Sequence, residues 1–431
     1  MITRRRLITN GALAAGAAVT IGRSATSLAA PASGELPPAI AALTSRQHEA
    51  RPVSRDERAG RRERARRLMS DSGLDAVLLA EGTSLLYFTG VHWWGSERLF
   101  AAVIPARGEP FYVCPAFEEG RAREQLAAGT DPASADVRTW QEDESPYERV
   151  AQGLRDRGIA GGRIGLEENV RFVFADGIGA AAPQAKFGSA TRVTAGCRMV
   201  KSEHEVALMR LAAEVTLAAY EAAYRSMRPG MTQHDVTELT RLAHQRLGFV
   251  GAADLVLVGE GAAFPHGSVA PQPIREGAIV LLDGGCDAEG YKSDISRTFV
   301  LGKATAKMNS VFATVQQAQA AALAAARPGV ECGAVDAAAR AVVTAAGYGP
   351  DYRYFTHRVG HGLGMDGHEW PYLVRSNRMR LAAGMTTSNE PGIYIRGEFG
   401  VRLEDDMHVT ESGAELFTPP SRSLEEPFAR A

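Results

Sequence analysis

The sequence predicts two domains: an N-terminal α/β domain and a C-terminal α+β domain in which an antiparallel sheet is flanked by helices. Three observations predict this fold class. Short apolar strands alternate with helix-like segments from residue 53 to residue 192. Longer helix-like segments and two hairpin patterns follow between residues 193 and 421. The length of 431 residues fits two or three domains, and a composition of 45% hydrophobic and 23% charged residues is typical of globular proteins.

Residues 1–30 have the pattern of a signal peptide of the twin-arginine type. Arg4, Arg5 and Arg6 precede a weakly apolar stretch rich in Ala and Gly, and small residues follow at a cleavage region near residue 30. This pattern predicts export to the periplasm or the extracellular space, and the alternative is a basic tail. The apolar run is shorter than the ~20 residues that a membrane span needs, so we expect no stable membrane insertion.

A linker is predicted at residues 31–52, and the N-terminal domain at residues 53–192. A charged helix opens this domain and leads into a buried strand at residues 76–80. Further strand-like segments lie at 85–89, 100–104, 110–114 and 163–166, and a helix-like segment lies at 146–157.

Charge excludes one class of partner. The net charge is −2 at pH 7, and such a chain lacks the positive electrostatic footprint of a nucleic-acid binder. The basic run at 58–67 is interleaved with acidic residues, so we predict a solvated helix face there. The four cysteines form no CxxC pair, and we expect free thiols.

The C-terminal domain begins with a helix start signal. Ser202 and Glu205 have the spacing of a capping box before a long apolar-periodic segment. Further helices are predicted at residues 232–247 and 304–326, and a strand at 255–258.

A first hairpin pattern covers residues 278–300. An apolar run ends on Asp283, a turn-rich segment follows, and a second run carries Asp294. A hairpin centred between Ala288 and Glu289 places Asp283 opposite Asp294, with Cβ atoms roughly 4.5–5.5 Å apart. Two ionised carboxylates at that distance repel each other, so the pair needs a shared proton or a cation.

A second hairpin pattern lies near the C-terminus. Its centre is Gly397, within a segment of turn composition, and it places Glu390 opposite Glu404. Between the two hairpins lies His361, which has glycine on both sides and therefore allows close backbone approach. Four carboxylates and one imidazole suit a pair of divalent ions of the Mn, Co, Fe or Zn type. Such ions lie roughly 3.5–4 Å apart and activate a bridging water.

Five ordered motifs resemble the pita-bread metallopeptidases, a family that includes methionine aminopeptidase, aminopeptidase P, prolidase and the related creatinase. The motifs are LLDGGCDAEGYKSDISRTF, GHGLG, HEWP, NEPGIY and VRLED. The resemblance implies a creatinase/prolidase-like domain at residues 53–192 and a pita-bread catalytic domain at 193–421. It also implies a homodimer. The metal ligands that it implies are Asp283, Asp294, His361, Glu390 and Glu404. Creatinase does not keep this ligand set.

The resemblance implies metal-assisted peptide hydrolysis with two divalent ions, Mn, Co or Zn. Asp283 would bind one ion through both oxygens, while Asp294 and Glu404 bridge the pair. Glu390 would complete the second ion's ligands, together with His361, and would act as general base.

Other residues are expected to handle the substrate. His266 would hold it, and His368 would contact the substrate carbonyl and the developing oxyanion. Arg402, two residues before Glu404, would pair with a site carboxylate or orient the substrate. His357 would support the site through hydrogen bonds.

The N-terminal domain and the HEWP motif favour the proline-specific branch, with short proline-containing peptides as substrates. The predicted activity is that of an Xaa-Pro dipeptidase. The alternatives are an aminopeptidase acting on longer peptides, a pita-bread hydrolase or lyase acting on a small metabolite, and a peptide-binding module without activity. Several prolidases have an arginine where this chain has Tyr372, which leaves Tyr372, Arg375 and Arg396 as candidates for binding a substrate carboxylate.

Overall fold

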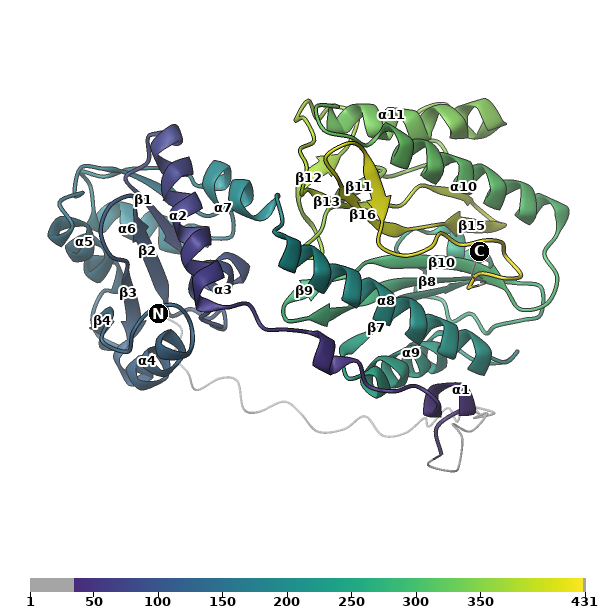
Figure 1. Ribbon diagram of the computed structural model, residues 1–431, viewed down its shortest axis with the longest axis horizontal. Helices are drawn as coiled ribbons and strands as arrows, with labels where there is room; N and C mark the ends of the chain where they lie inside the picture. Colours follow the sequence, from purple (N-terminus) through teal and green to yellow (C-terminus); the bar gives the residue numbers. More distant parts are fainter. Residues whose placement is uncertain (1–34, 429–431) are drawn as a thin grey trace, which may run out of the picture. The chain divides into compact units, whose positions relative to one another are not determined.

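The computed structural model describes residues 35–428, and residues from Pro37 onward form one compact unit (Figure 1). The predicted twin-arginine signal at residues 1–30 lies outside the described residues. Within the predicted linker the chain forms a short helix α1 (Pro38–Ala41), whose Ile40 is buried, and a turn of 3-10 helix at Gln47–Glu49.

The N-terminal domain is built on a six-stranded mixed sheet with strand order β4-β3-β2-β1-β5-β6. The central strand β1 pairs antiparallel with β2 and parallel with β5. The strands are β1 (Ala76–Leu79), β2 (Ala101–Pro105), β3 (Phe111–Pro115), β4 (Asp136–Trp140), β5 (Arg163–Leu166) and β6 (Lys186–Ser189). The helices are α2 (Arg55–Ser72), α3 (Thr83–Thr89), α4 (Glu119–Ala128), α5 (Pro146–Asp156), α6 (Phe172–Ala181) and α7 (Thr191–Arg198).

One predicted strand of this domain is wrong. The run at residues 85–89 forms helix α3, which ends at Gly90 in the left-handed conformation with φ 77°. In the last turn of this helix the Thr89 hydroxyl donates a hydrogen bond to the Leu85 carbonyl oxygen. A short continuous apolar run fits a buried helix as well as a strand, so its sequence could not decide between them.

The predicted solvated face of helix α2 is also wrong for two of its arginines. Arg61 and Arg62 are buried, with 8% and 6% of their surface exposed. Arg62 forms two hydrogen bonds with Asp131, and Arg61 donates to Glu205 and to the Tyr291 hydroxyl. Each buried charge therefore has an acidic partner, as burial of a guanidinium requires.

The helices of the C-terminal domain follow the sequence prediction closely. Helix α8 (Glu203–Ser226) begins with the predicted capping box, in which Ser202 and Glu205 exchange hydrogen bonds. Helices α9 (Gln233–Leu247) and α10 (Ala306–Ala325) match the segments predicted at 232–247 and 304–326. Helix α11 (Cys332–Val343) was not predicted.

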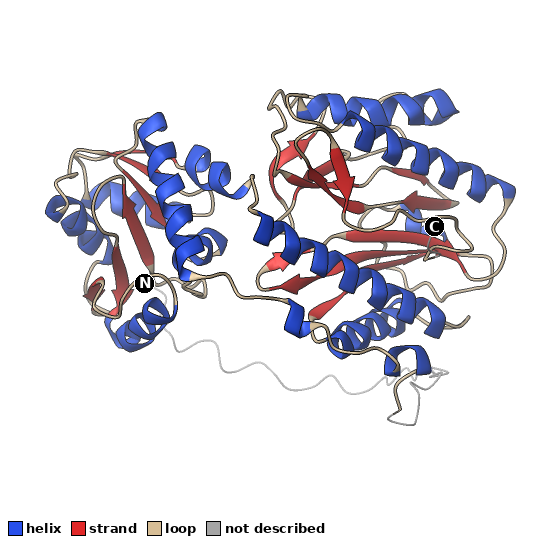
Figure 2. Cartoon of the chain, in the orientation of Figure 1, coloured by secondary structure: helices blue, strands red, loops and turns tan. Residues whose placement is uncertain are grey.

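Three sheets lie between these helices, with α8 and α9 on one side and α10 and α11 on the other (Figures 1 and 2). The first sheet has the strand order β10-β8-β7, and β9 also pairs with β8. The second has the order β12-β11-β13-β16-β17, and the third consists of β14 and β15. The strands are β7 (Val250–Val258), β8 (Ile279–Ala288), β9 (Tyr291–Lys292), β10 (Ile295–Val300), β11 (Gly360–Gly362), β12 (Glu369–Leu373), β13 (Thr386–Asn389), β14 (Gly392–Ile395), β15 (Phe399–Arg402), β16 (Asp405–Val409) and β17 (Ala414–Leu416). All pairs in this domain are antiparallel, as predicted.

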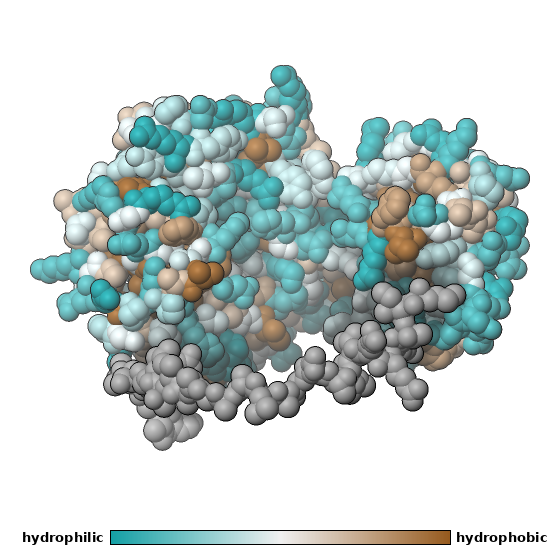
Figure 3. Space-filling view, turned by 180° about the vertical axis from the view of Figure 1, so that it is seen from behind, coloured by the Kyte–Doolittle hydropathy of each residue, from teal (hydrophilic) through white to brown (hydrophobic). Residues whose placement is uncertain are grey.

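Three further observations concern the helices, the thiols and the surface of the described residues. Across residues 35–428, no helix is both long and apolar enough to span a bilayer. All four cysteines are buried free thiols, which confirms the prediction. On the face shown in Figure 3, hydrophobic residues occur as separate small groups among hydrophilic ones, a distribution that is normal for a protein surface.

Candidate metal centre

The first hairpin brings Asp283 and Asp294 to one place, although the predicted register is wrong. In the structure Asp283 pairs with Ser296, and Asp287 pairs with Lys292. The turn consists of Glu289 and Gly290, both with positive φ (53° and 87°), as a two-residue hairpin turn requires. The partner of Asp283 is therefore displaced by two residues. Because side chains alternate with a period of two, Asp294 stays on the predicted face.

The second hairpin has the predicted register. Gly397 lies in the turn with φ 78°, and Gly392 pairs with Arg402. On the other side of Pro391 the same register continues, with Asn389 opposite Asp405. These two ladders bracket Glu390 and Glu404, which face each other where the strands are interrupted.

His361 lies on β11, buried between β12 and β13, with 2% of its surface exposed. A Cβ atom on Gly360 would come within 2.2 Å of the Ser388 carbonyl oxygen, and one on Gly362 within 2.2 Å of the Trp370 carbonyl oxygen. Only glycine fits such an approach, as predicted for the positions flanking His361. The His361 ring is oriented by its Nδ1 atom, which lies 3.1 Å from the Gly362 carbonyl oxygen.

The five predicted ligands form two overlapping groups. His361, Glu390 and Glu404 have donor atoms within 4.8 Å of one another, and so do Asp283, Asp294 and Glu404. Glu404 belongs to both groups, which is the position of a residue that bridges two ions. His361 Nε2 lies 3.3 Å from Glu390 Oε1 and 3.7 Å from Asp294 Oδ2.

The electrostatics of these groups favour a cation. Burial raises the pKa of Glu390 to about 7, and burial together with neighbouring carboxylates raises the pKa of Asp294 and Glu404 well above the usual range. Burial lowers the pKa of His361 to about 3, so the ring is neutral. Because its Nδ1–H donates to a carbonyl, the Nε2 lone pair faces carboxylate oxygens, and only a cation or a proton satisfies both.

The Arg402 side chain is buried beside the candidate ligands, and all of its guanidinium nitrogens have partners. Its Nη2 pairs with Asp283 Oδ2, its Nε donates to Ser296 Oγ at 2.9 Å, and its Nη1 donates to the Tyr394 hydroxyl at 3.0 Å. The ion pair with a site carboxylate is one of the two roles that the sequence left open. His357 Nε2 lies 2.7 Å from the same Tyr394 hydroxyl, which is the hydrogen-bonded support expected of His357.

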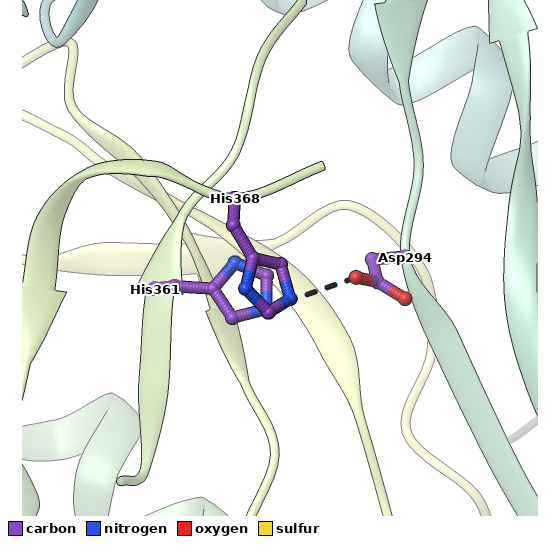
Figure 4. A group of neighbouring side chains, drawn as sticks. All are labelled: Asp294, His361 and His368. Atoms are coloured by element: carbon purple, nitrogen blue, oxygen red, sulfur yellow. Dashed lines mark ion pairs between the residues drawn. The ribbon is translucent and has the colours of Figure 1, made fainter. Parts of the chain in front are cut away.

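His368 and His266 line a cavity of about 470 Å³ beside the carboxylates. The His368 ring stacks on the His361 ring with centroids 3.7 Å apart, and Figure 4 shows both rings next to Asp294. Arg358 also lines the cavity, and its Nη2 lies 3.1 Å from His368 Nδ1. Since a guanidinium only donates, His368 accepts at Nδ1 and carries its proton at Nε2. Sequence reasoning missed Arg358, although its position three residues before His361 was a usable signal.

The comparisons with known proteins agree with this geometry. Residues 207–411 match the description "Metallopeptidase family M24", and residues 61–200 match "Creatinase/Prolidase N-terminal domain". A relative named putative dipeptidase YkvY, from Bacillus subtilis, is 33% identical over 83% of this chain and 96% of its own length. The chain belongs to metallopeptidase family M24. This membership makes it a metallopeptidase and implies divalent metal ions.

Two further comparisons extend over both domains of the M24 protein. An Xaa-Pro dipeptidase from Lactobacillus delbrueckii subsp. lactis is 33% identical over 83% of this chain and 96% of its own length. The crystal structure of dipeptidase PepE from Mycobacterium ulcerans superposes with a TM-score of 0.80 at 32% identity, covering 87% of this chain and 99% of that one. The predicted two-domain fold with a pita-bread catalytic domain is therefore confirmed.

Proposed function

We propose that the protein is a metal-dependent Xaa-Pro dipeptidase. The observation that carries this proposal is the convergence of five donor residues in two overlapping groups beside a cavity of about 470 Å³. Two of them lie on strands β8 and β11, and three lie next to the ends of β10, β13 and β16. The relatives named dipeptidase and Xaa-Pro dipeptidase, which match both domains, support the substrate class.

The residues that would hold two divalent ions of Mn, Co or Zn in this proposal are Asp283, Asp294, His361, Glu390 and Glu404. The donor set fits such ions because it offers carboxylate oxygens and one neutral imidazole nitrogen, and its acidic groups are largely withdrawn from water. Ions bound there supply Lewis-acid activation of a water molecule and of the peptide carbonyl.

The protein's own residues perform the proton transfers. Glu390 takes a proton from the attacking water and returns it to the proline nitrogen as the C–N bond breaks, giving a free amino acid and proline. The return is required because the departing nitrogen must gain a proton in order to leave as an amine. His368 donates from Nε2 to the carbonyl oxygen as negative charge develops there. His266 holds the substrate, and Arg402 keeps Asp283 in place.

The test is hydrolysis by metal-stripped protein after Mn, Co or Zn ions are added back. We expect metal-dependent cleavage of Leu-Pro, and little cleavage of Leu-Leu. Preference for Leu-Pro-Pro would assign the protein to the aminopeptidases that act on longer peptides. Failure to cleave any of the three with two ions bound would overturn the proposed substrate class and favour a small metabolite or a peptide-binding role.

We also propose that residues 1–30 direct export by the twin-arginine route, to the periplasm or the extracellular space, and that the enzyme is a homodimer. Changing Arg4, Arg5 and Arg6 to lysine should retain the protein in the cytoplasm of a bacterial host with this route, as judged by cell fractionation. Unchanged export would refute the signal. Sedimentation equilibrium would show a mass of two chains, and a single-chain mass would refute the dimer.

A further inference from the structure

The loop that carries His368 has few restraints of its own. Residues 364–368 connect β11 to β12 without regular structure, and two of these five residues are glycine. The His368 side chain is exposed, and across residues 35–428 its ring takes part in one hydrogen bond, with Arg358. The ring also stacks on His361. Because glycine widens the range of conformations open to a loop, contacts outside the ring must hold His368 beside the candidate metal centre.

The next residue, Glu369, has such contacts. Its Oε1 atom lies 2.6 Å from Lys201 Nζ, and its Oε2 atom pairs with Arg198. The side chains of Glu369, Lys201 and Arg198 are only 7%, 2% and 10% exposed. Charge-assisted hydrogen bonds of this kind are short and strong, and breaking one would leave a charge buried without a partner. The Glu369 carboxylate is therefore fixed on both of its oxygens.

The N-terminal domain also contacts the other end of the loop. Arg198, the last residue of α7, pairs with Asp366 at 2.6 Å as well as with Glu369. The hydroxyl of Thr83, the first residue of α3, donates to Asp366 Oδ1 at 2.5 Å. Residues on both sides of His368 are thus bonded to side chains of the N-terminal domain.

The last glycine of the GHGLG motif is explained by this ion pair. A Cβ atom on Gly364 would come within 2.5 Å of Glu369 Oε1 and 3.0 Å of Lys201 Cε. Glycine at this position therefore leaves the space that the paired side chains occupy. A larger residue would push away the end of the Glu369 side chain, which can move without a change in the backbone.

We propose that Glu369 is a positioning residue, which Arg198 and Lys201 anchor so that the neighbouring His368 stays beside the candidate metal centre. The two neighbours share no partner, because His368 contacts Arg358 and His361. Glu369 therefore acts on the His368 ring through the backbone that joins them. This inference rests on the proposed function, to which it adds a role for the N-terminal domain in holding the oxyanion donor.

The first experiment measures Leu-Pro hydrolysis by metal-loaded wild type and Glu369→Gln. We expect kcat to fall about 10- to 100-fold, because a misplacement of ~1 Å can cost about 100-fold. KM should stay within about two-fold of the wild-type value, since the lost interaction belongs to the transition state. Elemental analysis should show unchanged bound metal. An unchanged kcat would overturn the proposal.

A matched control separates positioning from loss of a buried ion pair. Glu205 on α8 is also a buried carboxylate that pairs with an arginine of the N-terminal domain, Arg61. Glu205→Gln should lower the midpoint of thermal unfolding, as Glu369→Gln does, but leave kcat unchanged. If Glu205→Gln lowers kcat as much as Glu369→Gln, the effect is general destabilisation and the proposal is wrong.

Gly364→Ala tests the same role without removing a charge. Its Cβ atom should displace the Glu369 carboxylate and lower kcat in the same range as Glu369→Gln. This variant decides the question if Glu369→Gln does not fold, and wild-type turnover by Gly364→Ala would then contradict the proposal.

A double variant shows whether Glu369 acts through His368. In the His368→Ala background, Glu369→Gln should cause no further loss of kcat beyond about two-fold, because the group that it positions is absent. A merely structural role would give the full additional loss in that background, and this outcome would overturn the inference.

NMR of the histidine rings in zinc-loaded protein gives a readout that needs no activity. The His368 signal, assigned by its absence in His368→Ala, is displaced by the ring current of the His361 ring stacked on it. Glu369→Gln and Gly364→Ala should move this signal toward the position of an exposed histidine, and Glu205→Gln should not. If wild type does not cleave Leu-Pro, the proposed function fails on its own. The inference about Glu369 fails only if its variants leave the His368 signal in place.

Discussion

Removing the metal should make the stability of this protein fall steeply with rising pH. Burial raises the folded-state pKa of Glu390 from 4.5 to about 7. A carboxyl whose folded pKa is raised contributes stability that is complete below its unfolded pKa and is lost as pH rises to the folded pKa. Between pH 5 and pH 7 the loss amounts to about 2 kcal/mol for this one group, because the slope stays below its limit of 1.36 kcal/mol per pH unit near either pKa. The raised pKa values of Asp294 and Glu404 act in the same direction.

The assay is urea unfolding in the presence of a chelator at pH 5 and pH 8, followed by circular dichroism. Metal-free wild type should be less stable at pH 8 than at pH 5, and Glu390→Gln should remove about 2–3 kcal/mol of that difference. The control Glu411→Gln, at an exposed position, should change nothing. Adding metal should restore stability most at pH 8, because ions bind ionised carboxylates. Parallel pH profiles for wild type and Glu390→Gln would refute the reasoning from burial.

Three further predictions concern single side chains. Asp294→Asn should abolish activity and reduce bound metal below two ions per chain in elemental analysis; two ions with normal turnover would exclude Asp294 as a ligand. His368→Ala should lower kcat about 100- to 1,000-fold, as loss of an oxyanion donor does, without changing metal affinity measured by calorimetry; an unchanged kcat would remove His368 from the reaction. Arg297→Met should destabilise the protein by about 3–5 kcal/mol in urea unfolding, because it leaves Asp405 buried without its partner; a loss below about 1 kcal/mol would contradict that role.

Local sequence patterns predicted those parts of the fold that short-range physics determines. The capping box at Ser202 and the second hairpin around Gly397 depend on residues close together in the chain, and both are as predicted. The first hairpin register was wrong because Glu289 adopts a positive φ that non-glycine residues seldom adopt. Asp283 and Asp294 still lie on the same face of the hairpin, because a displacement of two residues leaves each side chain on its face of the strand.

Long-range partners account for the rest of what the sequence could not show. Arg61 and Arg62 were expected at a solvated face, but their acidic partners Glu205 and Asp131 lie 144 and 69 residues away. Arg358 was missed although it lies only three residues before His361, because its contacts with the His368 and Tyr372 rings form only in the folded chain. The charge pattern along the chain therefore shows which segments carry charges, whereas pairing in space decides which of these charged side chains are buried.

A fully buried ion pair behind the candidate centre explains how Glu404 is positioned. Arg297 and Asp405 have no exposed side-chain surface, and their nearest charged atoms are 2.6 Å apart. Arg297 also donates to the Glu404 carbonyl oxygen at 2.8 Å, while Asp405 accepts from Thr418 and Gln319. Such a pair adds little net stability compared with apolar residues of the same shape. Its effect is geometric, because it fixes the backbone of Glu404. The Glu404 carboxylate is shared by both candidate ligand groups, and the neighbouring carboxylates repel it. The fixed backbone opposes this repulsion and keeps Glu404 in the site.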